Sequence, residues 1–128
     1  MASFTEDDAF NEILVKVLIA HAWSEGQINQ NARDVVLEWL KYLNMEGPEK
    51  ERTLKSLESR VDPFQAEIFN NELRAALIRG RQRDRLKNIC DHFRSVKRKS
   101  PAFEVNFLVA LGSILADRVG IERLFQDS

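Results

Sequence analysis

A dense group of basic side chains in the second half of the chain is the strongest candidate for chemistry. Residues 74–99, called here the basic belt, hold ten Lys or Arg residues against two acidic residues. Such a density of positive charge can bind phosphate groups, and each phosphate contact makes binding weaken as salt is added. The basic residues of the belt are Arg74, Arg79, Arg81, Arg83, Arg85, Lys87, Arg94, Lys97, Arg98 and Lys99.

Two interpretations of the basic belt are open. Residues 1–73 hold fourteen acidic residues against seven basic ones, so the belt can pair with acidic side chains of the same or a neighbouring molecule. Alternatively, the belt binds nucleic acid or another anionic surface through Arg81, Arg85, Arg94 and Arg98. No DNA- or RNA-reading motif accompanies it, and the pI of the chain is 6.1. We therefore favour pairing and keep anion binding as the alternative.

The side chains that can act as a nucleophile or a general base are few. Cys90 is the sole cysteine, and it falls at an apolar position of a helical pattern, where free cysteine is commonly buried. A reactive thiol is the alternative, because basic residues are close in sequence. His21 lies on an apolar face, which favours a core residue, whereas His92 lies on a polar face beside Asp91. No catalytic motif is apparent, so we expect a protein that is not an enzyme.

Helical periodicity organises the chain, and no convincing stretch has the period of two that is typical of a strand. Residues 13–22 are apolar at almost every position, and so are residues 105–116. A helix that is apolar nearly all round is one that other helices surround. We therefore expect an all-α fold, a single domain of residues 1–128. It should be a bundle of six or seven helices with two central apolar helices, at about 6–23 and 102–117.

Capping residues predict where the first three helices begin. Thr5 can cap the first helix, and either Asn29 or Asn31 can cap the second. Pro48 suits the first turn of a third helix, which should be short and peripheral because its apolar stripe is thin.

The later helices carry similar signals. Asp62-Pro63 starts a helix in which Phe64 and Ile68 are expected to be buried. Asn70-Asn71 is a candidate break that would divide this helix into two. A short amphipathic segment, residues 121–125, follows the last apolar helix.

The start of the chain and its apolar runs predict a cytoplasmic protein. The segment Ser3–Asp8 is acidic, whereas a secretory leader begins with basic residues. Lys16 interrupts the first apolar run, which is shorter than the roughly 20 residues that a membrane-spanning helix needs. We therefore expect no transmembrane segment.

The turn after the first apolar helix reads Trp23-Ser24-Glu25-Gly26-Gln27-Ile28 and leads into a second helix that starts with polar residues. This arrangement resembles the TerB-like domain, the family of the tellurite resistance protein TerB, in which the turn usually reads Ala-Asp-Gly-x-Ile/Val. The resemblance covers the first forty-odd residues best. It implies a non-enzymatic helical domain associated with tellurite resistance and related stress responses.

The resemblance also implies a divalent metal as a possible ligand, since some members of the family bind one through the acids of such turns. Here Glu25 replaces the usual aspartate, and amides replace the acids at the start of the second helix. Hard cations need several oxygen ligands, so Asp117 and Glu122 would have to join Glu25. We favour a structural role for the turn, and no cofactor is expected.

Taken together, these patterns favour a module that binds other proteins. Trp23 ends the first helix beside polar residues, and an exposed tryptophan there would suit a binding hot spot. The basic belt, with Arg81, Arg85, Arg94 and Arg98, is the other candidate surface for a protein partner. The uneven distribution of charge is also compatible with self-association. Binding of nucleic acid or of another anionic surface, and binding of a metal, remain the alternatives.

Overall fold

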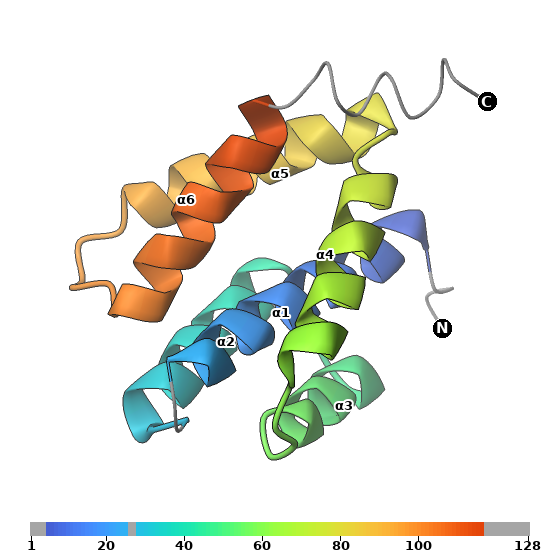
Figure 1. Cartoon of the computed structure of the whole chain (residues 1–128). Helices are drawn as coiled ribbons and strands as arrows, with labels where there is room; N and C mark the ends of the chain where they lie inside the picture. The colour runs from blue at the N-terminus through green and yellow to red at the C-terminus, as the bar shows by residue number, and fades with distance from the viewer. Residues whose placement is uncertain (1–4, 26–27, 117–128) are drawn as a thin grey trace.

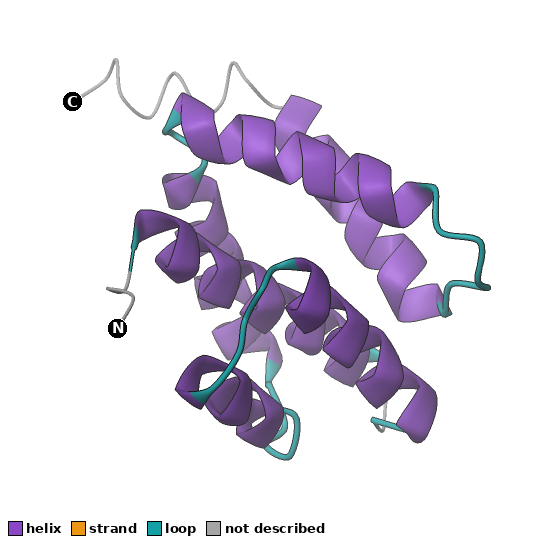
Figure 2. Cartoon of the chain, turned by 180° about the vertical axis from the view of Figure 1, so that it is seen from behind, coloured by secondary structure: helices purple, strands orange, loops and turns teal. Residues whose placement is uncertain are grey.

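The computed structural model describes residues 5–25 and 28–116, and every regular element among them is an α-helix (Figure 1). Figure 2 shows only helices and connecting loops in this part of the chain. The predicted all-α class is therefore confirmed, while the amphipathic segment 121–125 lies outside the described residues. The helices are α1 (Glu6–Ser24), α2 (Gln30–Tyr42), α3 (Pro48–Ser56), α4 (Pro63–Ala76), α5 (Gly80–Arg94) and α6 (Ala102–Ala116).

Local capping signals begin the first three helices where the sequence predicts. The Thr5 hydroxyl accepts a hydrogen bond from the Asp8 N–H at 3.1 Å, and the Asp8 carboxylate accepts one from the Thr5 N–H at 2.9 Å, which completes a capping box. Asn29, rather than Asn31, caps α2 by accepting from the Ala32 N–H at 2.8 Å. Pro48 opens α3, which is short and contributes no buried residue of its own.

One helix, α4, runs unbroken through Asn70-Asn71, so the candidate break at this pair does not divide it. The Asp62 carboxylate caps it by accepting from the Gln65 N–H at 2.8 Å, and Pro63 occupies its first turn. Asparagine lowers helix propensity by only about 0.7 kcal/mol relative to alanine. Because α4 packs extensively on α1, tertiary contacts outweigh this local preference.

The expected burial of Phe64 and Ile68 is also wrong. Their side chains are 73% and 41% exposed, whereas Leu73 is fully buried and Ala66 is partly buried. A rotation of 100° per residue places Phe64 and Ile68 on the side of α4 opposite Ala66 and Leu73. The apolar residues of α4 are therefore divided between the core and an outer face.

The first helix, α1, is the centre of the bundle. It contacts α2, α3, α4 and α6, and its residues from Leu14 to Ala22 are buried except at Lys16 and, in part, His21. As expected, the two most apolar helices, α1 and α6, pack against each other, and α5 lies alongside α6 (Figure 1). However, α6 is not surrounded on all sides, because Val105 and Val109 are 46% and 63% exposed.

Trp39 of α2 joins three helices in the core. It is fully buried, and its ring is stacked on Phe93 of α5 with centroids 3.8 Å apart and an interplanar angle of 2°. Phe107 of α6 lies at 5.2 Å in a tilted arrangement. Aromatic pairs of this kind contribute about 0.5–1.5 kcal/mol beyond the area that they bury.

Candidate functional site

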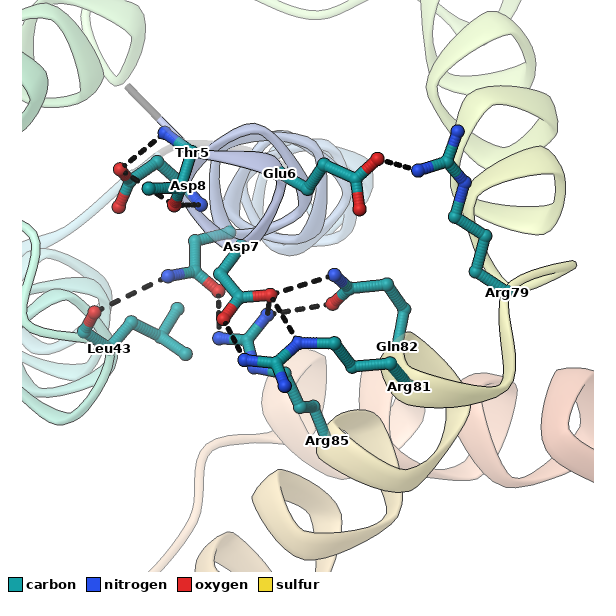
Figure 3. A network of polar contacts seen from close by, with 10 residues as sticks. Thr5, Glu6, Asp7, Asp8, Leu43, Arg79, Arg81, Gln82 and Arg85 are labelled. Atoms are coloured by element: carbon teal, nitrogen blue, oxygen red, sulfur yellow. Dashed lines mark hydrogen bonds and ion pairs between the residues drawn. The ribbon is translucent and has the colours of Figure 1, made fainter. Parts of the chain in front are cut away.

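Two predicted contact residues of the basic belt meet the start of α1 (Figure 3). Arg81 donates two hydrogen bonds to the Asp7 carboxylate, from Nε at 3.2 Å and from a terminal nitrogen at 2.7 Å. Gln82, which is buried, donates a third from Nε2 at 2.9 Å. The hydrogen bond from Arg81, followed by that from Gln82, holds the pKa of Asp7 well below its usual range.

Arg85 extends this network toward α2 (Figure 3). It donates to the Gln82 side-chain oxygen at 2.7 Å and to the Asn11 side-chain oxygen at 2.8 Å. Asn11 is buried and donates in turn to the Leu43 carbonyl at 3.4 Å. The Arg85 guanidinium also lies 5.6 Å from the centre of the Phe10 ring. Arg85 therefore connects α5 to α1 and to the end of α2.

Arg98 belongs to a second network, which surrounds a buried carboxylate that the sequence analysis did not single out. Glu104 of α6 is 0% exposed and accepts two hydrogen bonds from Arg98, at 2.7 and 2.8 Å, and one from the Trp39 indole N–H at 2.6 Å. Burial alone would raise the pKa of Glu104, but the hydrogen bonds from Arg98 and Trp39 outweigh it and the net pKa is lowered. Arg98 also pairs with Glu38 of α2.

These networks bear on the two interpretations of the basic belt. Four of its arginines form ion pairs with acids inside the described chain, and three of the acids, Glu6, Asp7 and Glu38, come from the acidic first part. This is the pairing that we favoured. Phosphate binding by the same side chains would have to compete with these ion pairs. The four arginines are Arg79, Arg81, Arg85 and Arg98.

The remaining predicted contact residue, Arg94, lines a hollow of about 700 Å³ between α5 and α6. Its terminal nitrogen lies 3.5 Å from the Leu108 carbonyl oxygen, which is a long hydrogen bond. The charges around the hollow nearly cancel, so it has no strong preference for an anion. Its charged lining residues are Arg83, Asp84, Lys87, Asp91 and Arg94.

The predicted metal ligand Glu25 and the predicted partner residue Trp23, both at the end of α1, make different contacts. The exposed Glu25 carboxylate accepts a hydrogen bond from the Asn106 amide of α6 at 3.0 Å, which joins the two apolar helices. Asp117 and Glu122 lie outside the described residues, and the part of the chain with described structure contains no group of three potential metal ligands. Trp23 is half-buried, and its indole N–H is buried without a hydrogen-bond partner among the residues described.

The candidate nucleophile and bases are placed in packing contacts. Cys90 is buried, and burial raises the pKa of its thiol to about 11, so the thiolate form is scarce at neutral pH. His21 is half-buried with its ring 5.3 Å from that of Phe107, and burial lowers its pKa. His92 is exposed and stacks on Tyr42 at 3.9 Å between ring centres.

Sequence reasoning missed the outer face of α4, which carries the most exposed large apolar side chain among the described residues. Phe64 and Ile68 are four residues apart, so they lie one above the other on this face. The signal was present in the sequence: the rotation that brings Ala66, Leu73 and Leu77 to one side of the helix places Phe64 and Ile68 on the other. Val105 and Val109 form a similar pair on α6.

Comparison with known proteins adds no relative. No protein-family model matches the chain, and neither a curated protein nor a solved structure does so. The TerB-like resemblance therefore stays a prediction that rests on the turn after α1. Separately, none of the helices described is both long and apolar enough to cross a membrane.

Proposed function

We propose that the chain is a non-enzymatic module that binds another protein through the outer face of α4. The observation that carries this proposal is the exposure of Phe64 and Ile68, at 73% and 41%, on the side of α4 opposite its buried residues. A scattered exposed apolar residue needs no explanation, but a phenylalanine paired with an isoleucine at helical spacing forms a continuous apolar stripe.

The partner that fits this face presents an apolar groove bordered by basic residues. Helical recognition commonly uses apolar anchors at positions i and i+4 that enter such a groove. Glu67 and Glu72 are exposed on either flank of the stripe. Opposite charges at the rim would set the orientation of the complex and speed association.

A catalytic role has less support. The Cys90 thiol is buried and largely protonated, and the His21 imidazole is packed against Phe107. Anion binding through the basic belt has less support as well, because Arg81, Arg85 and Arg98 already have carboxylate partners. A role in a stress response of the TerB type would be compatible with a binding module, but it rests on the resemblance alone.

The test is site-specific photo-crosslinking on the outer face of α4. A photoreactive phenylalanine analogue at position 64 should give crosslinked products in host cells, and one at Asn88, an exposed polar position on α5, should give fewer. A partner identified in this way should bind Phe64→Ser/Ile68→Ser at least about 30-fold more weakly, since a hot-spot side chain contributes about 2 kcal/mol or more. Val109→Ser on α6 is the control, and it should bind normally.

Two results would contradict the proposal. One is equal crosslinking at positions 64 and 88. The other is unchanged affinity of the double variant for the captured protein. The double variant should keep the melting temperature of the native chain, because both side chains are exposed, so a loss of binding would not reflect unfolding.

A further inference from the structure

A second hollow lies on the other side of the bundle, between α1, the end of α3 and the start of α4. Its volume is about 330 Å³, which is at the small end of the range for ligand sites. Three basic side chains line it, Lys16, Lys55 and Arg60, and no acidic residue of the described chain does so. This composition distinguishes it from the hollow between α5 and α6, where basic and acidic residues alternate.

The three cations of this hollow have no ion-pair partner among the described residues, in contrast to the paired arginines of the basic belt. The acids nearest to Arg60 in sequence are Glu58 and Asp62. Glu58 forms no ion pair with the three cations, and Asp62 is engaged in capping α4 through the Gln65 N–H at 2.8 Å. Three like charges around one concave surface repel one another, and an anion would relieve that repulsion.

The rest of the lining is suited to an organic group. Ile19, Val61 and Phe69 give the hollow an apolar floor. The Lys16 ammonium lies 5.6 Å from the centre of the Phe69 ring, so this cation is held over the floor. The hydroxyl of Ser59 is a further donor at the edge.

Lys16 is also the position at which the sequence departs from its own pattern. It is the one charged residue within the apolar run of α1, and it is exposed at the hollow while its neighbours Val15 and Val17 are buried. Lysine lowers helix propensity very little, but apart from the contact with the Phe69 ring its ammonium has only repulsion from the two other cations at this hollow. Binding of an external anion would explain why a lysine stands at this position.

We propose that this hollow binds a phosphate monoester, with its phosphate between Lys16, Lys55 and Arg60 and its organic group on the floor of Ile19, Val61 and Phe69. A phosphate monoester carries a charge of about −1.5 to −2 at neutral pH and three acceptor oxygens. Three cationic donors match the number of acceptor oxygens and more than balance the charge of the phosphate. This inference goes beyond the proposed function and does not depend on the outer face of α4.

The test is a titration of the full chain with phenyl phosphate, followed by amide chemical shifts. Saturable shifts are expected at Ser59, Arg60 and Val61. Lys55→Gln/Arg60→Gln should weaken binding by about tenfold for each cation removed. Both side chains are exposed and unpaired within the described chain, so the double variant should melt as the native chain does.

The matched control is Arg83→Gln/Lys87→Gln, which removes two cations from the hollow between α5 and α6. It should leave the affinity for phenyl phosphate unchanged. Inorganic phosphate should bind at least about tenfold more weakly than phenyl phosphate, because it makes no contact with the apolar floor.

A comparison of phenyl phosphate with a phosphotyrosine peptide identifies the source of the phosphate group. A short phosphotyrosine peptide that binds more tightly than phenyl phosphate would assign the site to a phosphorylated protein, and equal affinity would assign it to a small metabolite. Either result supports the proposal. It is overturned if phenyl phosphate gives no saturable shift at residues 59–61, or if both double variants weaken binding equally.

Discussion

The buried Glu104 provides the sharpest test of how the bundle is held together. Its carboxylate accepts three hydrogen bonds, from Arg98 at 2.7 and 2.8 Å and from Trp39 at 2.6 Å. In Glu104→Gln the amide oxygen can accept the hydrogen bonds that one carboxylate oxygen accepts in the native chain. The amide nitrogen replaces the other carboxylate oxygen, and it then faces a donor N–H group without an acceptor between them. We expect the loss of one charged hydrogen bond and an incompletely compensated Arg98, which together cost about 3 kcal/mol.

That loss is large relative to a typical total stability of about 5–15 kcal/mol. For a chain of 128 residues, an unfolding entropy of about 2.1 cal/mol/K per residue converts it to a fall in melting temperature of roughly 10 °C. Urea unfolding followed by far-ultraviolet circular dichroism measures the free energy, and differential scanning calorimetry measures the temperature.

Glu38→Gln is the matched control, because Glu38 pairs with the same arginine but its side chain is 41% exposed. An exposed ion pair contributes about 0–1 kcal/mol, so this variant should lose much less stability than Glu104→Gln. If the two variants lose the same amount, or if Glu104→Gln loses less than about 1 kcal/mol, the carboxylate is not buried and paired as described.

The Glu104 carboxylate should also make the stability of the chain depend on pH in acid. Burial tends to raise the pKa of Glu104, but the hydrogen bonds from Arg98 and Trp39 lower it below its ordinary value. The stabilisation is therefore complete above the pKa of an unfolded glutamate, about 4.3, and is lost as the pH falls through the folded value. Glu104→Gln lacks this component, so the gap in stability between the native chain and the variant should narrow as the pH is lowered below about 4.

Three further predictions concern other parts of the bundle. The pKa of Asp7 is lowered chiefly by the hydrogen bond from Arg81, so the stability that this ion pair adds is present above the ordinary aspartate pKa and is lost in acid. Asp7→Asn should therefore flatten the acid limb of a curve of unfolding free energy against pH, and an unchanged limb would contradict the pairing. Cys90 should react with a thiol reagent at pH 8 only after urea unfolds the chain, because burial raises its pKa to about 11; rapid labelling of the native protein would show that it is exposed. Gly112→Ala should stabilise α6 by about 0.5–1 kcal/mol, since the added methyl group meets only the movable end of the Arg94 side chain; a loss of stability in urea unfolding would mean that Arg94 cannot move.

Local signals predicted the helices well because they act over a few residues. Thr5, Asn29 and Asp62 each cap the helix that follows. The apolar runs of α1 and α6 predicted that these two helices pack together in the core. The count of helices was uncertain at Asn70-Asn71, where packing against α1 decided the outcome, and at residues 121–125, which lie outside the described part of the chain.

The sites were harder to predict because their partners are far apart in the chain. Seventy-four positions separate Asp7 from Arg81, and sixty-five separate Trp39 from Glu104. Nothing in the local pattern indicates which arginine meets which acid, so Arg81, Arg85 and Arg98 looked available for a partner. Composition alone cannot distinguish a paired basic belt from one that is open to phosphate.

The central position of α1 has a consequence for how the chain is made. This helix leaves the ribosome before the other helices described, yet one of the helices that cover it, α6, comes last among them and ends at Ala116. Until α6 emerges, the side of α1 that α6 covers stays open to water or to other molecules, and exposed apolar surface of this kind is prone to aggregation. A nascent chain halted before Ala102 should therefore be bound by chaperones far more than one released after Ala116.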